Sequence, residues 1–339
     1  RNQFYINQPS HSIFLKYTRR VKNLILSLLF LIFRSKKILS SVLKLRFNLL
    51  NKTKILLEKN YDLIIVQDLN LLPLANEIKK TARIIFDARE FYPLQNEESK
   101  YFKIIEKPQR MFLCNHFLSK CDKVVTVSPG IIEAYNNYFK LKPDLLRSTP
   151  FYSNIKYSKT SRSKIKMVHH GVANKNRNLG KMIEITNLLD ERFTLDFYLT
   201  GSVSDISHIK NLSRDSTKVR VLDPVPYDEI VPTLTSYDIG FFYVEPTTFN
   251  LYNCLPNKLF EFIQARIAVA IGPSPDMAQL VNNYNCGFVS DFFTIDSMVK
   301  KLSTIDKELI DEAKFNSNIA AENLCYEKEI LSLKRFIGE

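Results

Sequence analysis

Cysteine is scarce in this sequence, and its placement excludes a disulfide framework. The 339 residues contain five cysteines, an odd number, with no C-x-x-C pair. This pattern argues against a disulfide-stapled secreted domain and against a zinc ribbon, and it predicts a reducing compartment. The cysteines are Cys114, Cys121, Cys254, Cys286 and Cys325.

The apolar run NLILSLLFLIF (Asn23–Phe33) is too short to cross a membrane. It holds eleven uncharged residues, whereas a membrane-spanning helix needs roughly 20. No signal-peptide pattern is visible either, but the chain begins at Arg1 rather than Met, so this absence excludes nothing.

Acidic residues are nearly absent from the first 60 positions. This segment holds thirteen Lys and Arg against one acid, Glu58, so it carries a net charge of +12, and the other 279 residues carry only +1. An apolar helix bracketed by cations is typical of a helix that lies in a membrane interface with anionic headgroups, which predicts membrane contact through residues 16–37. The alternative is a core helix packed on the sheet, with solvated basic flanks. A nucleic-acid partner is not predicted, because the aromatic and glycine interleaving of an RNA-binding surface is missing.

After residue 60 the sequence alternates short apolar strand patterns with helical patterns, and it is long enough for two domains. Such alternation indicates parallel sheets covered by helices on both faces. The predicted strands are 61–68, 81–90 and 122–128, followed by 165–171, 194–201, 218–223, 237–244, 267–272 and 286–290.

A polar stretch without periodicity divides these strands into two groups. The predicted organisation is therefore two Rossmann-like α/β domains that face each other across a ligand cleft. No strand pattern precedes residue 60, so the first domain is expected to lack its first β-α-β unit. The predicted parts are an N-terminal domain (1–148) with a basic and apolar segment (12–60), a linker (149–164), a C-terminal domain (165–320) and a C-terminal helix (321–339) that could pack back on the first domain.

The loop after strand 165–171 is the first candidate phosphate site. Gly171 at the strand end would let a ligand approach the backbone. A helix expected from about Asn178 would offer free N–H groups, and Arg177 a forked donor. An ordinary loop with a solvated arginine is the alternative. His169 and His170 have no third ligand at a useful spacing, so no metal site is predicted.

The stretch NCLPNKLFEFIQARIAVAIG (253–272) contains the second candidate. Pro256 suits a helix start, which places Lys258 in the first turn and Glu261 about one turn further on. Lys258 could neutralise a phosphate, and the carboxylate of Glu261 could accept both hydroxyls of a ribose. Alone, this would be a capped helix start, but together with the loop at Gly171 it favours a nucleotide diphosphate.

From about residue 60 to 305 the chain resembles a GT-B glycosyltransferase of family 4 (glycosyl transferases group 1). In the first domain, QDLNLLPLA resembles the family's H-D-x-x-x-L-P-L-A, DAREFYP its D-A-H-E-x-x-P, and TVSPGI its T-V-S-x-x-I. In the second, RNLGKMIE resembles R-G-L-x-x-L-I-E, and CLPNKLFEF closely matches S-L-P-N-K-L-F-E-Y.

The resemblance implies transfer of a sugar from a nucleotide-sugar donor, with the configuration usually retained and no bound metal or cofactor. Arg177 and Lys258 would bind the donor diphosphate and stabilise charge on the leaving group. The other implied donor-binding residues are Gly171, Val225 near the base, Asn253, Asn257 and Glu261. Asp68, Arg89 and Glu90 are implied on the acceptor side, with Arg89 and Glu90 also counted, like Arg177 and Lys258, as catalytic.

Four positions depart from the family pattern. Asn253 stands where the first acid of E-x7-E is expected, and an asparagine could still hydrogen-bond a sugar hydroxyl. Arg89 and Gln67 replace two histidines, and Arg89 is a permanent cation at a position that usually touches the donor sugar. Arg266 replaces a turn glycine, which is expected to be a structural change.

The resulting prediction is a retaining, metal-independent glycosyltransferase of bacterial surface polysaccharide synthesis, such as capsule or O-antigen. It would act on a glycan or lipid-linked acceptor as a peripheral protein on the inner face of the cytoplasmic membrane. The departures at Arg89 and Asn253 leave an alternative, a catalytically inactive GT-B module that scaffolds a partner enzyme. A sugar-nucleotide epimerase is a third possibility, although its expected acids and histidines around the sugar are not evident.

Overall fold

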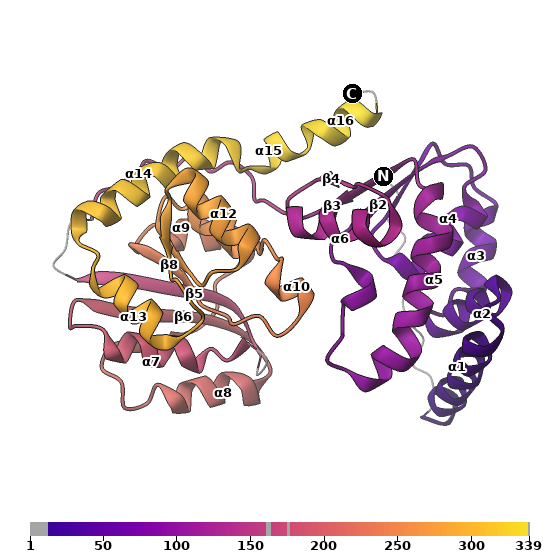
Figure 1. The fold of residues 1–339 in the computed structure, drawn as a ribbon, viewed down its shortest axis with the longest axis horizontal. Helices are drawn as coiled ribbons and strands as arrows, with labels where there is room; N and C mark the ends of the chain where they lie inside the picture. Colours follow the sequence, from indigo (N-terminus) through magenta and orange to yellow (C-terminus); the bar gives the residue numbers. More distant parts are fainter. Residues whose placement is uncertain (1–12, 161–163, 175–176, 338–339) are drawn as a thin grey trace. The chain divides into compact units, whose positions relative to one another are not determined.

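The computed structural model describes residues 13–160, 164–174 and 177–337, which form two compact units (Figure 1). The first unit contains the described residues up to Thr126 together with Glu133–Asp144. The second contains Val127–Ile132 and the described residues from Leu145 onward. Parts of the predicted N-terminal domain (1–12), linker (161–163) and C-terminal helix (338–339) lie outside the described residues.

A four-stranded sheet in the order β1-β2-β3-β4 is the centre of the first unit. The β1–β2 and β2–β3 pairs are parallel. Among described residues 13–62 no strand precedes β1, in line with the incomplete first domain that the sequence predicts. The two-residue β4 was not predicted. The strands are β1 (Leu63–Val66), β2 (Arg83–Ala88), β3 (Lys123–Thr126) and β4 (Asp144–Leu145).

Helices α4 and α5 lie beside this sheet, and α1, α2 and α3 form a further layer against them (Figure 1). Residues 102–120 form a π-helical turn (Phe102–Glu106), α5 and a 3-10 turn (Leu118–Lys120). The helices are α1 (Ile13–Phe33), α2 (Lys36–Arg46), α3 (Leu50–Leu57), α4 (Leu72–Ile78), α5 (Lys107–Phe117) and α6 (Pro129–Phe139).

The second unit is built on a six-stranded sheet in the order β10-β9-β8-β5-β6-β7, with every pair parallel. The central strands are buried along their length, as strands covered on both faces must be. All six predicted strands are present. They are β5 (Ile165–Ala173), β6 (Phe193–Gly201), β7 (Val219–Leu222), β8 (Ile239–Phe242), β9 (Ala268–Ile271) and β10 (Gly287–Val289).

Helices cover both faces of this sheet (Figure 1). Helices α7, α8 and α13 form one layer, and α9, α11, α12 and α14 the other, with the apolar core between them and the strands. The helices are α7 (Gly180–Leu188), α8 (Val203–Leu212), α9 (Ile230–Leu234), α10 (Phe249–Tyr252), α11 (Asn257–Gln264), α12 (Pro275–Tyr284), α13 (Ile295–Ser303) and α14 (Lys307–Asn323).

The polar segment 146–160 forms neither helix nor strand, but it is attached to the second unit. The backbone N–H of Ser153 donates to Oε1 of Gln264 at 2.9 Å, and that of Thr160 donates to Oδ1 of Asp311 at 2.6 Å. The predicted C-terminal helix 321–339 contains the end of α14 and two short helices, α15 (Tyr326–Glu329) and α16 (Leu331–Ile337).

Arg266 stands where the resemblance leads one to expect a turn glycine. Its backbone has a left-handed φ of 61°, and its side chain is buried. The guanidinium donates to the carbonyl of Gln264 at 2.6 Å, to the carbonyl of Ser153 at 2.8 Å and to Oδ1 of Asn318 at 3.0 Å. The arginine therefore joins the end of α11, segment 146–160 and α14, which is a structural role.

Candidate functional site

The carboxyl ends of β5 and β8 bring the two sequence candidates of the second unit together. These strands are neighbours in the sheet, and α11 follows β8 in the chain. Gly171 near the end of β5 has a φ of 120°, which L-residues rarely adopt. A Cβ built at this position would lie 3.0 Å from Nζ of Lys258, the second residue of α11. The predicted juxtaposition of Gly171 and Lys258 is thus present.

Lys258 is a buried amine without a hydrogen-bond partner among the described residues. Only 7% of the residue is exposed, and among the described residues its Nζ has no hydrogen-bond partner. It lies over the ring of Phe242, 4.8 Å from the centroid. Burial and the positive charge of Arg177 lower the pKa of Lys258 to about 7, against an opposing effect of Glu261. Buried polar groups are normally satisfied, so this amine is placed to receive an anion.

Helix α11 adds donors beside this amine. Its N-cap residue, Pro256, provides no side-chain cap. The first N–H groups of a helix lack intrahelical acceptors, and they point along the positive end of the helix dipole. Lys258 and these N–H groups together form a corner rich in unpaired donors at the end of β8.

Glu261 provides a carboxyl group one turn further along α11. It is 5% exposed, and burial raises its pKa to about 7, with the charge of Lys258 opposing. Its Oε2 lies 3.2 Å from Nε2 of His170 on β5, close enough for an ion pair but outside hydrogen-bond geometry. Burial and the charge of Lys258 lower the pKa of His170 to about 3, so this imidazole is neutral at pH 7. Glu261 therefore keeps acceptor capacity for a polar ligand.

Arg177 contributes a second cation to this end of the sheet. Its charge lowers the pKa of Lys258 and opposes the burial that raises the pKa of Cys254 to about 11. Helix α7 begins at Gly180, two residues later than the start expected at Asn178, because Asn178 has a left-handed φ of 42°. Arg177 thus lies in the loop before the helix.

Asn253 is buried, whereas Asn257 is exposed. Asn253 is buried at the end of α10, where its Nδ2 donates to the carbonyl of Phe249 at 2.9 Å. Its own carbonyl accepts a 2.5 Å hydrogen bond from the hydroxyl of Ser128. A Cβ added to Gly130 would clash with its amide. Asn257 is exposed as the first residue of α11.

Val225 lies in the loop after β7, at the edge of the sheet. It is half-buried and sits two strands away from β5, since β6 separates β5 from β7. Because the strands are parallel, this loop shares the carboxyl edge of the sheet with Gly171.

The first unit has a polar cluster at the ends of β1 and β2. Asp68 caps a short 3-10 turn through a 2.8 Å hydrogen bond from the N–H of Asn70. Nε of Arg89 lies 3.3 Å from Oδ2 of Asp87, which also accepts a 3.4 Å hydrogen bond from Gln67. The side chain of Arg89 remains 57% exposed. Gln67 and Arg89, which stand where the resemblance leads one to expect histidines, thus contact the same carboxylate.

Glu90 directly follows Arg89 and is half-buried. Burial raises its pKa, while a hydrogen bond to Gln95 and the charge of Arg110 act in the opposite direction and Asp68 adds to the rise. Its backbone carbonyl accepts a 3.0 Å hydrogen bond from the hydroxyl of Tyr135.

The two histidines have separate surroundings. Nδ1 of His169 lies 3.0 Å from the carbonyl of Phe241, whereas His170 faces α11. Across the part of the chain that the structure describes, no group of three or more His, Cys, Asp and Glu side chains is placed to hold a metal ion.

The sequence interpretation missed His170 as a neighbour of Glu261 and Phe242 as the ring beneath Lys258. Both lie at the ends of adjacent strands, and the alternation of side chains along β5 could have indicated that His170 and His169 face opposite sides. The adjacency of β5 and β8 was the missing information.

The two α/β units, each with a parallel sheet, define the class of fold, which is shared with GT-B glycosyltransferases of known structure. Neither a protein-family model nor a curated protein matches the chain. Similar solved structures include a mutant of Staphylococcus aureus TarM with UDP, at a TM-score of 0.65 and 13% identity, covering 84% of this chain and 57% of that one. Anabaena HepE, solved with UDP, has a TM-score of 0.68 and 12% identity, covering 85% and 81%.

WaaG, a glycosyltransferase involved in lipopolysaccharide biosynthesis, has a TM-score of 0.58 and 14% identity, covering 78% of this chain and 81% of that one. The chain thus spans little more than half the length of TarM but about four fifths of HepE and WaaG. At these identities the likeness establishes the fold: two Rossmann-like units of the GT-B type.

Proposed function

We propose that this protein is a glycosyltransferase that uses a nucleotide-sugar donor bound by the second unit. The observation that carries the proposal is Lys258, a buried amine without a hydrogen-bond partner among the described residues, beside Gly171 and an uncapped helix N-terminus. A diphosphate supplies the negative charge and the acceptor oxygens that this corner lacks.

The other donor contacts follow from the same placement. Arg177 would add a second cation to the diphosphate, and the two cations would stabilise charge on the departing nucleotide without a metal ion. Glu261 would accept the ribose hydroxyls, and the loop at Val225 would border the base. Because TarM and HepE were solved with UDP, UDP-sugars are the first donors to test.

Asn253 would act indirectly. Its Nδ2 is engaged with Phe249, and its amide packs against Gly130. We therefore assign it to positioning the loop that leads to Asn257 and Lys258, in place of the direct contact with the sugar that the sequence suggests.

For the first unit we propose an acceptor-side role of Asp68, Arg89 and Glu90. The exposed guanidinium of Arg89, held on one side by Asp87, suits an acceptor or donor group that carries negative charge. The proposal further includes an acceptor linked to lipid or glycan and transfer with retention of the sugar's anomeric configuration. It also includes a role in bacterial surface polysaccharide synthesis.

The proposed location is the inner face of the cytoplasmic membrane, reached through residues 16–37. Support comes from α1, on which seven large apolar side chains between Val21 and Phe33 are exposed while the polar Ser27 is buried. This inverted pattern argues against the alternative of a core helix packed on the sheet. None of the described helices is long and apolar enough to cross a membrane.

Release of free nucleotide from a UDP-sugar, measured with a membrane extract as acceptor source, tests the function. We expect release by the parent chain and a drop of about tenfold or more in Arg89→Ala, which removes one charged contact. Lys300→Ala, an exposed lysine of α13, is the matched control and should retain the parent rate. UDP binding without release from any donor would instead support the scaffold alternative.

A further inference from the structure

Helices α1 and α2 form a hairpin with an apolar groove along one side. The groove has a volume of about 490 Å³, which is within the usual range for sites of small ligands. Its lining residues recur at helical spacing on both walls, so each wall is one face of its helix. They are Lys22, Ile25 and Leu26 on α1, and Ser41, Lys44 and Leu45 on α2.

Polar bonds between the two helices hold this groove in shape. The guanidinium of Arg19 donates to the carbonyls of Leu45 at 2.6 Å and Arg46 at 2.9 Å, at the end of α2. Nδ2 of Asn23 donates to the carbonyl of Val42 at 2.9 Å. The groove therefore exists before any ligand arrives, which lowers the ordering cost of binding.

Lysine stands on each wall, and apart from these lysines and Ser41 the lining residues are apolar. Lys22 is exposed, and Lys44 is half-buried in a 2.9 Å ion pair with Glu77 of α4. The sequence between positions 13 and 57 contains no acidic residue. An occupant with an apolar chain and a negatively charged head matches this distribution.

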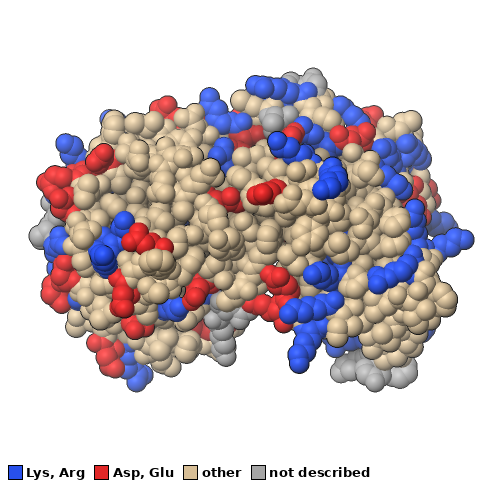
Figure 2. All heavy atoms as spheres, in the orientation of Figure 1, with Lys and Arg blue, Asp and Glu red and all other residues tan. Residues whose placement is uncertain are grey.

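The groove is continuous with the exposed apolar surface of α1, because Ile25 belongs to both. Figure 2 shows uncharged atoms over the part of the molecule where Figure 1 places α1, with lysine and arginine side chains beside them. A molecule that enters from a membrane would thus pass from one apolar surface to the next.

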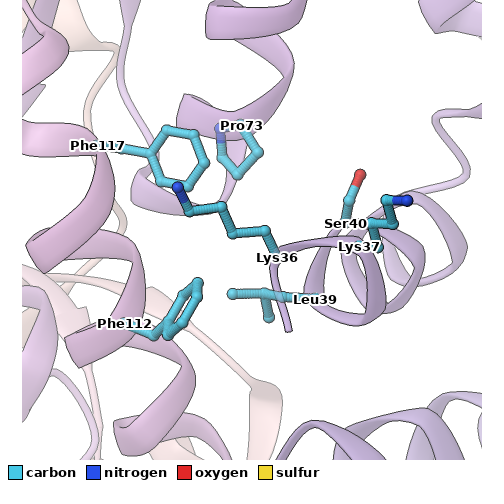
Figure 3. Close-up of a pocket in the computed structure, with 7 residues that line it drawn as sticks. All are labelled: Lys36, Lys37, Leu39, Ser40, Pro73, Phe112 and Phe117. Carbon is cyan, nitrogen blue, oxygen red and sulfur yellow. The ribbon is translucent and has the colours of Figure 1, made fainter. Parts of the chain in front are cut away.

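The hollow on the other side of α2 is a weaker candidate. It measures about 210 Å³, and Figure 3 shows Lys36 extending through it, with its amine beside Phe117 and its aliphatic stem near Leu39 and Phe112. The space left beside this side chain is less than half that of the α1–α2 groove.

We infer that the α1–α2 groove binds one acyl chain of an anionic membrane lipid, with the lipid phosphate at Lys22 and Lys44. The inference rests on the membrane contact proposed above and deepens it. It distinguishes a single lipid bound in a defined site from a helix that merely lies on a charged surface.

Individual lipid molecules provide the test, because they separate the groove from surface partition. The chain contains no tryptophan, so Ile25→Trp introduces a single fluorescent reporter at the rim. In the full chain, titration with dihexanoyl-phosphatidylglycerol in its monomeric form should give a saturable fluorescence change. Dihexanoyl-phosphatidylcholine, with the same chains and no net charge, should bind more weakly.

Two variants at the exposed Ser41 test whether the lipid binds inside the groove. In the reporter background, Ser41→Phe fills the groove and should weaken binding about tenfold, equivalent to about two methylene groups expelled. Ser41→Ala leaves the groove open and should bind as the reporter protein does. Absence of saturable binding, or equal binding by both variants, would overturn the inference.

Flotation with phosphatidylglycerol vesicles distinguishes lipid binding in the α1–α2 groove from the proposed membrane contact of residues 16–37. If Ser41→Phe still floats while failing to bind the monomeric lipid, both the groove and the membrane contact are supported. If the parent floats but binds no monomeric lipid, the groove assignment fails alone. If the chain instead forms a dimer that Ser41→Phe abolishes, a second copy covers the groove and the lipid inference is wrong.

Discussion

Nζ of Lys258 lies 3.0 Å from the position that a Cβ on Gly171 would occupy. The contact joins the end of β5 to the first turn of α11, two segments almost 90 residues apart in the chain. Only glycine leaves this space open, and its φ of 120° excludes most other residues as well. The proposed diphosphate would lie beside this glycine backbone, within reach of the amine.

Gly171→Ala should weaken UDP binding and reduce stability. The left-handed backbone alone costs about 1–3 kcal/mol for an L-residue, and the new methyl group would displace Lys258. We expect at least about a tenfold loss of affinity for UDP in calorimetry. In the Lys258→Ala background the same substitution should cost less affinity, because the two residues act on one contact. Full additivity of the two losses would contradict the proposed contact.

The buried amine of Lys258 predicts a stability change with pH. Its folded-state pKa of about 7 lies below the ordinary 10.5, so between these values the unfolded state binds more protons. This group therefore makes the free energy of unfolding rise as pH increases from about 7 toward 10.5. Lys258→Met should remove that rise and should stabilise the free protein near pH 7 by about 1–3 kcal/mol.

Urea unfolding at pH 7 and at about pH 9 measures this slope. Lys300→Met, at an exposed lysine, should keep the slope of the parent. Glu261 acts in the opposite direction, because its pKa is raised from 4.5 to about 7. Between these pH values the folded state binds more protons than the unfolded state. The stabilisation by this group is therefore lost as the pH rises from 4.5 to about 7. A parent protein without any rise above pH 7 would show that Lys258 is not desolvated.

Glu261 should discriminate ribose from deoxyribose. A carboxylate that accepts a hydrogen bond from a ribose hydroxyl contributes about 1.5–3 kcal/mol. The parent should therefore bind UDP more tightly than 2′-deoxy-UDP, and in Glu261→Gln this preference should shrink. Competition binding with both nucleotides measures it. An unchanged preference in the variant would remove Glu261 from the ribose site.

Arg266→Ala should destabilise the second unit while leaving nucleotide affinity largely intact. The guanidinium is buried and donates to Gln264, Ser153 and Asn318. Its loss leaves buried acceptors unsatisfied and should cost about 2–5 kcal/mol in urea unfolding. Arg266→Gly should be less harmful than Arg266→Ala by up to about 1 kcal/mol, because glycine relieves the φ of 61°. Equal stability of all three proteins would contradict the anchoring role.

The strand pattern made the sheets predictable, and the start of α11 made the spacing of Lys258 and Glu261 predictable. The position of His170 against Glu261 was not predictable, because it depends on β5 lying next to β8 in the sheet. This strand order leaves no local signal in the sequence. Burial of Arg266 and of Asn253 was missed for a similar reason. Both side chains are enclosed by segments distant in the chain, and their residue types are ordinarily exposed.

For helix α1, amino-acid composition alone does not predict which face is exposed. Its charge bias and its apolar run were evident from the sequence, but its bounds and the outward direction of its apolar side chains were not. That direction depends on which face packs on α2 and α5, where Phe30 meets Phe112 at a ring distance of 5.2 Å. Only the packing distinguishes a membrane-facing helix from a core helix of the same composition.

The proposed donor site is tested by a UDP titration of the parent, Arg177→Ala, Lys258→Ala and Lys300→Ala in calorimetry. We expect saturable one-to-one binding by the parent and by Lys300→Ala. We expect a loss of about ten- to hundredfold in each of the other two, because a charged hydrogen bond to a phosphate is removed. If all four proteins bind UDP alike, or if none binds UDP, GDP or CMP derivatives, the donor site is not at Lys258.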